Sequence, residues 1–454
     1  MKIYQSWYHP DINITILDIV LILVILFFAY VYGSRKSSNN FDKAEYKFFK
    51  SALIYKILVS VVFALTVLFF YPGDSFSYFQ SINSFSKLFF ENPQHYFNIL
   101  VFGNKPEFHS YFNANTGYPP YYMWRDANSI FVARFYSIFM FLTYRSYLLS
   151  TIIASLIGFT GLWKFYKTLC KIYPGIEQKF IFAIMYMPSL FFWTSGIMKD
   201  TLTVSAIGWI IYAFYELVII KKIKVKYILI IIISSIIIIN VKAYVLLALA
   251  PGLFIWAFFG QMKAIKSKVL KFLLAPAILG ILLLVFSLLM RNASEYMGVY
   301  GDIEATLTQA SVVQQDLLRY EQYGQNYYDI GKFEATPMGV LKKFPEATIS
   351  GIYRPFLWEA GNPFVLLAAL ESLFLLVYLL YVAFKTKIIR FFKIVFSDPL
   401  LIFSLSFVII FSFGIGLASA NFGALARYKA PMLPFYVASL FIIEYIFNKK
   451  KSRK

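Results

Sequence analysis

The sequence has little charge, few acids, and almost no cysteine or histidine. Only 15% of its 454 residues are charged, too few to cover a water-soluble domain of this size. The one cysteine, Cys170, cannot form an internal disulfide, and the three histidines have no metal-ligand spacing. These shortages exclude a disulfide scaffold and argue against zinc and redox chemistry.

Most of the residues are apolar. They make up 59% of the chain, and the mean hydropathy is +0.65. Runs of about 17 to 25 apolar residues recur along the sequence, each long enough to cross the roughly 30 Å of bilayer hydrocarbon as a helix. The sequence therefore predicts an all-α, polytopic membrane protein.

Basic residues outnumber acids by 43 to 23, giving a net charge of +20. They do not favour nucleic acid as a partner, because they lie in short clusters between apolar runs. Loops enriched in Lys and Arg are typically cytoplasmic, so we expect the six clusters on that side. These clusters hold 26 of the 43 basic residues and cover 35–50, 164–179, 221–226, 263–271, 385–393 and 449–454.

Fitting spans between these clusters predicts about eleven crossings, with the N-terminus outside and the C-terminus inside. The expected spans are 12–33, 51–71, 148–166, 179–198, 201–220, 227–241, 243–260, 269–290, 363–384, 399–418 and 430–448. The sequence has no internal repeat, which predicts one membrane domain over 1–454, with C-terminal helices from 363 onward.

The two longest loops, 72–147 and 291–362, both fall on the predicted outer side. Residues 128–143 are apolar, but a crossing there would move the basic cluster 35–50 outside, so we expect an interfacial helix instead. Residues 303–322 have apolar side chains near helical spacing, which predicts an amphipathic helix. Chemistry or recognition is therefore expected on the outer face.

Charged residues gather at the predicted outer ends of the spans. They are Asp74 in YPGDSFSYF, Lys199 and Asp200 in GIMKD, Lys242 in INVKAY, Arg354 and Glu359 in YRPFLWEAGNP, and Arg427 and Lys429 in ALARYKAP. Ionisable groups near membrane depth are costly and tend to be paired or functional. Each also has a structural interpretation, since Pro-Gly-Asp-Ser is typical of a turn or helix cap and the cations could anchor headgroups.

Taken together, acids and cations on one face favour transfer from a lipid-linked phosphate or diphosphate. An acid would deprotonate the acceptor hydroxyl or hold a metal, and cations would neutralise the departing phosphate. We expect Asp74 and Asp200 to be catalytic. We expect substrate or phosphate binding from Lys199, Lys242, Arg354, Glu359, Arg427 and Lys429. The segment YPPYYMW, 118–124, suits stacking on sugar faces or an interfacial aromatic belt.

This layout resembles the GT-C superfamily of membrane glycosyltransferases, which use polyprenyl-phosphate-linked sugars. The similarity covers 51–362: a span, a long outer loop that begins with an acid, several short-looped spans, and a second long outer loop. It implies that Asp74 is the first-loop acid, Asp200 the second acidic position, and Arg427 of RYKAP a phosphate contact. Members commonly have two adjacent acids in the first loop, whereas Gly73 precedes Asp74 here, so a divalent metal stays an open question.

The hypothesis that follows is an inverting glycosyltransferase of a bacterial cytoplasmic membrane. It would move a sugar from a polyprenyl-phosphate carrier to an acceptor on the outer face, with the lipid-linked donor and membrane lipid as partners. The segments WTSGIMKD and RPFLWEA are also similar to polysaccharide-assembly proteins, which keeps an O-antigen-type polymerase open. A lipid-linked sugar transporter or flippase is a further alternative, although most charges lie at span ends and only a few, such as Glu371, lie within a span.

Overall fold

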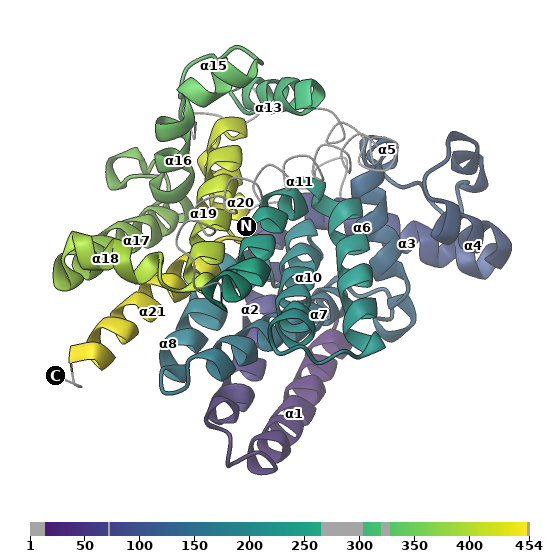
Figure 1. Ribbon diagram of the computed structural model, residues 1–454. Coiled ribbons are helices and arrows are strands. Elements are labelled where there is room, and N and C mark those ends of the chain that lie inside the picture. Colours follow the sequence, from purple (N-terminus) through teal and green to yellow (C-terminus); the bar gives the residue numbers. More distant parts are fainter. Residues whose placement is uncertain (1–13, 71–72, 265–302, 319–326, 452–454) are drawn as a thin grey trace. The chain divides into compact units, whose positions relative to one another are not determined.

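The computed structural model describes residues 14–70, 73–264, 303–318 and 327–451 (Figure 1). The predicted span 269–290 and part of the loop 291–362 lie outside these ranges. Within them the regular secondary structure is helical, apart from an isolated β-bridge between Tyr327 and Asn421. The predicted all-α class is therefore confirmed for the described residues.

Seven helices in the described part of the chain are long and apolar enough to cross a membrane. They are α1 (Ile16–Ser38), α2 (Phe49–Phe69), α7 (Tyr147–Ile172), α10 (Lys199–Phe214) continued by a π-helical turn (Tyr215–Ile219), α11 (Val225–Ala264), α17 (Pro363–Thr386) and α19 (Pro399–Ala418). The pair α20 (Phe422–Tyr428) and α21 (Leu433–Lys451), bent by 62°, makes an eighth if it is counted as one span. A multi-pass membrane protein is supported, but the predicted count of eleven is not confirmed.

The predicted span 179–198 is not one regular helix. The chain there contains α8 (Glu177–Ile181), a π-helical turn (Phe182–Tyr186) and α9 (Pro188–Trp193). Pro188 has no N–H to donate and cannot continue a preceding helix, and Met187 before it is extended. The run 179–198 is apolar and long enough to span a bilayer, but Pro188 interrupts the helix.

The predicted spans 227–241 and 243–260 both fall within α11. Their expected separation, a turn at Lys242, appears as a break in an otherwise helical run, because Lys242 has φ −152° and ψ 72°. α11 is therefore one continuous apolar element, but its backbone is not helical at Lys242, the residue where a turn was predicted.

Residues 128–143 do not form a helix long enough to cross a membrane. The helix here, α6 (Ala127–Ser137), has 11 residues and is followed by a short 3₁₀ turn (Met140–Leu142). At 1.5 Å per residue it extends only about 16 Å, roughly half of the hydrocarbon thickness. This agrees with the prediction that the segment is not a span.

Helix starts follow capping signals that are legible in the sequence. Asn362 and Asp398 each precede a proline, and their side chains accept hydrogen bonds from backbone N–H groups of α17 and α19. Proline at the first helical position sacrifices no hydrogen bond, because the first N–H groups of a helix have no intrahelical acceptor. The boundaries of these two spans are therefore fixed locally.

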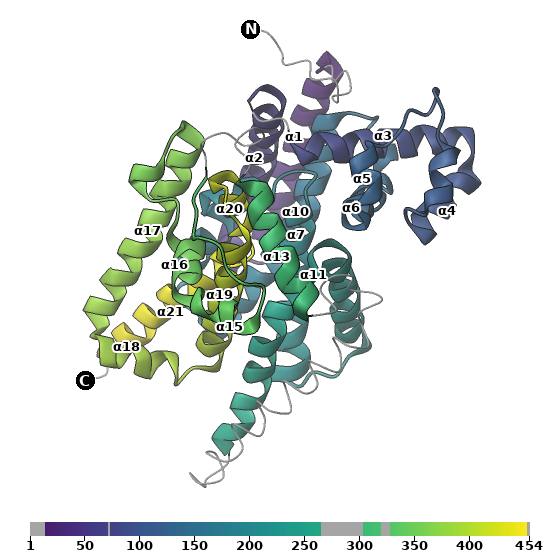
Figure 2. The same cartoon turned by 90° about the horizontal axis from the view of Figure 1, so that it is seen from above.

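The described residues form two compact units. Unit 1 comprises the described residues of 1–177, 191–215 and 224–242, and unit 2 comprises those of 178–190, 216–223 and 243–454. In unit 1, α7 packs along α10 and α2, and α2 packs along α1 (Figure 1). The long loop 72–147 adds α3 (Asp74–Glu91), α4 (Pro93–Phe102), α5 (Tyr121–Arg125) and α6, which lie together in Figure 2.

One buried apolar cluster joins the spans of unit 1 to this loop. It includes Phe63 of α2, Phe76 of α3, Ile130 of α6, Tyr147 of α7 and Leu202 of α10. For side chains that would otherwise face water, burial of apolar surface is the main contribution to the free energy of folding. For side chains that would otherwise face lipid, close van der Waals packing between helices takes that role. The loop that begins with Asp74 is thus packed on the spans.

Unit 2 is built around α19 (Figure 1). Helices α16 (Phe344–Tyr353), α13 (Ile303–Leu317) and α21 pack on it, and α17 packs on α21. The rings of Phe407 in α19 and Phe435 in α21 lie 4.9 Å apart. The helix α13 falls within the amphipathic stretch predicted at 303–322.

Glycine permits the closest helix contacts in both units. A Cβ on Gly161 in α7 would collide with the carbonyl oxygen of Ser205 in α10, and a Cβ on Gly416 in α19 would collide with the carbonyl of Ala347 in α16. Small residues let backbones approach when no hydrophobic force pulls helices together in lipid.

We expect Gly161→Ala to lower the thermal unfolding midpoint of the detergent-solubilised protein by several degrees. Its methyl would meet backbone, which cannot rotate away, and overpacking of this kind costs about 1–3 kcal/mol. Gly414→Ala in α19 is the matched control, because nothing lies within 4 Å of the added Cβ and alanine favours the helix. Equal midpoints for the two variants, measured by size-exclusion chromatography after heating, would contradict the packing argument.

Candidate functional site

Asp74 is the first residue of α3, where Gly73 is the N-cap and supplies no side-chain cap. The sequence left a turn and a cap as alternatives, and the structure instead places Asp74 inside the first helical turn. An acid here is favoured by the positive end of the helix dipole. Its side chain is half-buried, so its carboxylate is neither sealed in the core nor fully solvated.

Helix α3 is largely buried, through polar as well as apolar side chains. Five of its serines are buried, and they are Ser75, Ser77, Ser81, Ser84 and Ser86. The Ser75 and Tyr147 hydroxyls lie 2.9 Å apart, and Ser77 is hydrogen-bonded to the Tyr122 hydroxyl. One turn after Asp74, α3 is therefore attached to the predicted tyrosine-rich segment 118–124.

That segment forms one wall of a cavity of about 520 Å³, which we call the aromatic cavity. It is lined by Asn104, Pro106, His109, Tyr121, Trp124 and Arg125. The His109 ring lies 5.9 Å from the ring of Tyr121 and 5.6 Å from that of Trp124. The indole Nε1 of Trp124 is buried and has no hydrogen-bond acceptor among the described residues. The cavity thus combines flat apolar rings with polar edges.

Asp126 follows the aromatic cavity wall directly and was missed by the sequence analysis. It caps α6 by accepting a hydrogen bond from the Asn128 N–H at 3.0 Å, and its other oxygen accepts from Lys199 Nζ at 2.9 Å. Burial raises the pKa of Asp126, but the charge and hydrogen bond of Lys199, together with Ser129 and Asn128, leave the pKa below its ordinary value. The N-cap signal in Asp-Ala-Asn-Ser could have identified it, but its pairing with Lys199 could not be inferred.

Asp200 and Lys242 form a buried ion pair. Lys242 Nζ lies 2.5 Å from Asp200 Oδ1, and the side chain of Lys242 is 6% exposed and that of Asp200 is 0% exposed. The structure therefore brings together two of the predicted site residues. It also moves Lys199 and Asp200 from the expected turn into the first turn of α10. A fully buried, ion-paired carboxylate is poorly placed to meet a substrate.

Lys56 in α2 is a second buried cation of unit 1, and the sequence analysis did not single it out. Its side chain is fully buried, and Nζ donates to the Thr194 carbonyl and to Thr194 Oγ1, both at 2.8 Å. The ring of Phe191 lies 4.6 Å from the ammonium. A lysine interrupting the apolar run 51–71 was the available signal, since such groups are seldom tolerated without partners.

In unit 2, Lys429 is satisfied by three oxygens. Its Nζ donates to the Ile352 carbonyl at 2.8 Å, to the Arg354 carbonyl, and to Ser372 Oγ at 2.9 Å. A lysine ammonium has three N–H donors, so all of them are used. Lys429 therefore joins α16 and α17 to α20, and its predicted phosphate contact would require these bonds to break.

Arg354 and Glu359 also pair within unit 2. Arg354 Nε lies 3.3 Å from Glu359 Oε1, and the guanidinium lies 4.9 Å from the centre of the Tyr328 ring. Arg354 Nη1 is buried without a hydrogen-bond partner among the described residues. Arg427 in α20 is half-buried, and the next residue, Tyr428, lines an apolar cavity of 270 Å³ beside α13 and α19.

The predicted residues thus fall into two groups. Asp74, Lys199, Asp200 and Lys242 belong to unit 1. Arg354, Glu359, Arg427 and Lys429 belong to unit 2. Their convergence in one pocket stays a prediction. Within the described ranges, no three His, Cys, Asp or Glu side chains come close enough to hold a metal ion, so no step below is assigned to a metal.

Comparison with known proteins finds no match to this chain among protein-family models, curated proteins or solved structures.

We expect either Asp200→Asn or Lys242→Gln alone to destabilise unit 1 strongly, because each leaves the other charge buried without its partner. Such losses are about 3–5 kcal/mol. The double variant should recover most of the thermal midpoint, because two amides of nearly the original shape can hydrogen-bond to each other. A double-mutant cycle of thermal midpoints measures this, and additive losses with no recovery would show that the pair is not coupled.

The Asp126–Lys199 pair should give a small, pH-dependent stabilisation. Because the pKa of Asp126 is lowered in the fold, the contribution is complete above the ordinary aspartate value of about 3.9 and is lost as pH falls through the folded value. Asp126 is 45% exposed, so the effect should be no more than about 1 kcal/mol.

The corresponding variant is Asp126→Asn, which preserves an N-cap and removes only the charge. The difference in thermal midpoint between wild type and variant should be present at pH 7 and shrink below about pH 4. Repeating the comparison in Lys199→Gln protein is the control. If Asp126→Asn still changes the thermal midpoint in Lys199→Gln protein, the effect does not come from the Asp126–Lys199 pair.

Proposed function

We propose that this protein is a membrane glycosyltransferase that moves a sugar from a polyprenyl-phosphate carrier to an acceptor hydroxyl at the outer face of the membrane. The observation that carries the proposal is the link between Asp74 and the aromatic cavity. A half-buried carboxylate begins α3, and the next turn of that helix is hydrogen-bonded through Ser77 to the cavity-wall segment. Among the residues that line the cavity, His109 and Arg125 are titratable, which is typical of active sites, whereas Asp74 is connected to the cavity-wall segment through α3 and does not itself line the cavity.

The size and lining of the aromatic cavity support a sugar as the ligand. Its 520 Å³ lies within the roughly 300–1,000 Å³ of small-molecule sites. The rings of Tyr121 and Trp124 offer apolar faces for the C–H face of a sugar, and Asn104 and His109 offer hydrogen bonds to its hydroxyls. An aromatic wall with polar edges matches the amphipathic character of a pyranose ring.

In the proposed reaction, the Asp74 carboxylate takes the proton of the acceptor hydroxyl. The acceptor oxygen bonds to the anomeric carbon on the face opposite the phosphate. The bond between that carbon and the phosphate oxygen breaks, and its electron pair leaves with polyprenyl phosphate, which gains one negative charge. The anomeric configuration is inverted, and a base aligned with the attacking oxygen lowers the barrier.

Two cations of unit 1 are suited to stabilise the departing phosphate. Arg125 lines the aromatic cavity and is exposed, and Lys199 is bonded to the neighbouring Asp126. Cations next to developing negative charge stabilise it most where water is excluded. Phosphate contacts by Arg354, Arg427 and Lys429 stay predictions, and so does the cytoplasmic-membrane location.

The proposal gives Asp200 a structural role instead of the expected catalytic one. Asp200 is fully buried against Lys242, whereas Asp74 is half-buried at a helix start. The neutral double variant Asp200→Asn with Lys242→Gln should therefore retain transfer activity if it folds. This separates the two acids, which the sequence treated as a pair.

Asp74→Asn should reduce sugar transfer by roughly 10²–10⁴-fold, the usual contribution of a general base. The assay uses purified protein in proteoliposomes with a panel of polyprenyl-phosphate sugars and lipid or glycan acceptors. Asp42→Asn is the matched control, since Asp42 is exposed and lies in the predicted cytoplasmic cluster.

Two outcomes would contradict the proposal. Wild-type turnover by a folded Asp74→Asn protein would remove Asp74 from the mechanism. The wild-type protein could also give no product with any donor and instead move the lipid-linked sugar across the bilayer. That result would identify the activity as transport and not glycosyl transfer.

A further inference from the structure

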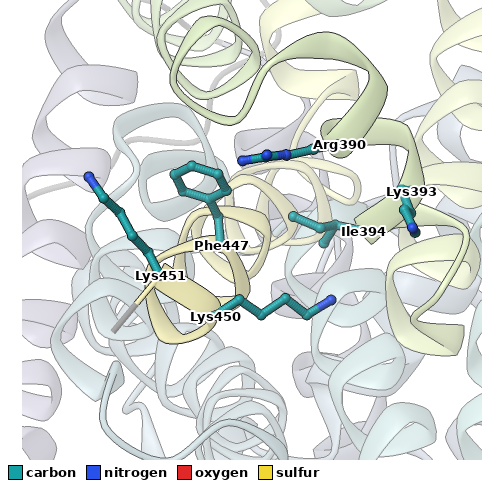
Figure 3. A pocket seen from close by; sticks show the side chains of 6 residues that line it. All are labelled: Arg390, Lys393, Ile394, Phe447, Lys450 and Lys451. Carbon is teal, nitrogen blue, oxygen red and sulfur yellow. The ribbon is translucent and has the colours of Figure 1, made fainter. Parts of the chain in front are cut away.

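The described part of unit 2 contains a cavity of 510 Å³ bordered by four cations, which we call the basic cavity. It is lined by Arg390, Lys393, Ile394, Phe447, Lys450 and Lys451. Figure 3 shows these side chains, which come from α18 (Ile388–Val395) and from the C-terminal end of α21. In that view Arg390, Lys393 and Lys450 lie to one side of Phe447, and Lys451 extends on the other. Four cations from segments more than 50 residues apart thus border one space.

No acid in the described ranges pairs with these four cations. The acid of α21, Glu444, precedes the cavity-lining Phe447 by three residues and already has partners. Its carboxylate lies 2.5 Å from Lys179 Nζ and 2.6 Å from Lys385 Nζ, and it accepts a hydrogen bond from the Tyr378 hydroxyl. Like charges around one cavity repel, so their arrangement favours an anion from outside the chain.

Helix α18, which lines the basic cavity, connects two of the helices long enough to span a membrane. Helix α18 follows the end of the apolar helix α17 and precedes the start of α19. One face of α18 is buried through Phe391, Ile394 and Val395. Its other face exposes Ile388, Ile389 and Phe392, with Ile389 81% exposed. An exposed apolar face next to a cationic cavity at the end of spans is typical of an interfacial helix.

We infer that the basic cavity binds the phosphate headgroup of an acidic phospholipid, whose acyl chains lie along the exposed apolar face of α18. Arg390 offers a planar fork of donors to phosphate oxygens, and the lysines add charge. Ile394 and Phe447 provide apolar contact for the glycerol region. A headgroup without an amine is favoured, because a choline or ethanolamine cation would meet four positive side chains. This site is separate from the proposed glycosyl transfer and does not depend on it.

The charge cluster has a further consequence for lipid selectivity. Basic residues near an anionic leaflet contribute about 1 kcal/mol each, so four of them can select acidic lipid strongly. The positive-inside pattern of the sequence predicts that this leaflet is the cytoplasmic one. A free phosphate would share the charge contacts but would gain nothing from the apolar face of α18.

The test compares the full-length protein with a variant in which Arg390, Lys393, Lys450 and Lys451 are all changed to glutamine. Native mass spectrometry measures lipid binding to the detergent-solubilised protein, titrated separately with phosphatidylglycerol, phosphatidylcholine and sn-glycerol 3-phosphate. The wild type should bind phosphatidylglycerol at least about tenfold more tightly than either of the others, and the variant should lose this preference.

The matched control changes Lys43, Lys47, Lys221 and Lys224 to glutamine. These four lysines are exposed and lie in other predicted cytoplasmic clusters. Their substitution removes the same total charge as the substitution of the four cavity cations. The control should keep the preference for phosphatidylglycerol. Equal losses in the two variants would show that net charge alone attracts the lipid, and equal binding of glycerol phosphate and phosphatidylglycerol would exclude the acyl-chain contact. Either result overturns the inference, provided that both variants elute as single folded species.

Discussion

A charge surrounded by apolar helices must find its partners inside the protein, and this requirement organises both units. Asp200 pairs with Lys242, Lys56 donates to both oxygens of Thr194, and Lys429 uses all three of its donors on oxygens of unit 2. Each contact joins segments distant in sequence, so satisfying the charge also fixes which helices meet. Breaking one partner leaves an uncompensated group where neither water nor lipid can solvate it.

Burial distinguishes these charges from the groups that the proposed reaction uses. Lys242, Asp200 and Lys429 are buried and paired, so a substrate would have to displace an existing partner. Asp74 is half-buried at the start of α3, and Arg125 is exposed beside the aromatic cavity. The proposed reaction therefore rests on groups at the edge of the packed helices. The four cations of the basic cavity belong to this accessible class too, at a different place in the fold.

Much of the local structure could be predicted because its causes are local. Apolar length identified the span helices, helical spacing identified α13, and Asn-Pro and Asp-Pro pairs mark the starts of α17 and α19. The run 179–198 was wrong as a continuous span because hydropathy does not register the effect of Pro188 on the backbone. Lys56 and Asp126 were overlooked for a related reason. The importance of each comes from a partner, Thr194 or Lys199, that lies far along the chain.

The sequence by itself determined that the chain is helical, membrane-embedded and rich in charges at helix ends, because hydropathy, capping and charge clustering act over one or two turns. Only the tertiary structure decided which charges meet. Asp74 and Asp200 looked equivalent as acids beside predicted spans, yet one begins a helix with a half-buried carboxylate and the other is sealed against Lys242. The physical reason is that burial and pairing depend on contacts between helices that are far apart in the sequence. The residues of one segment do not determine these contacts.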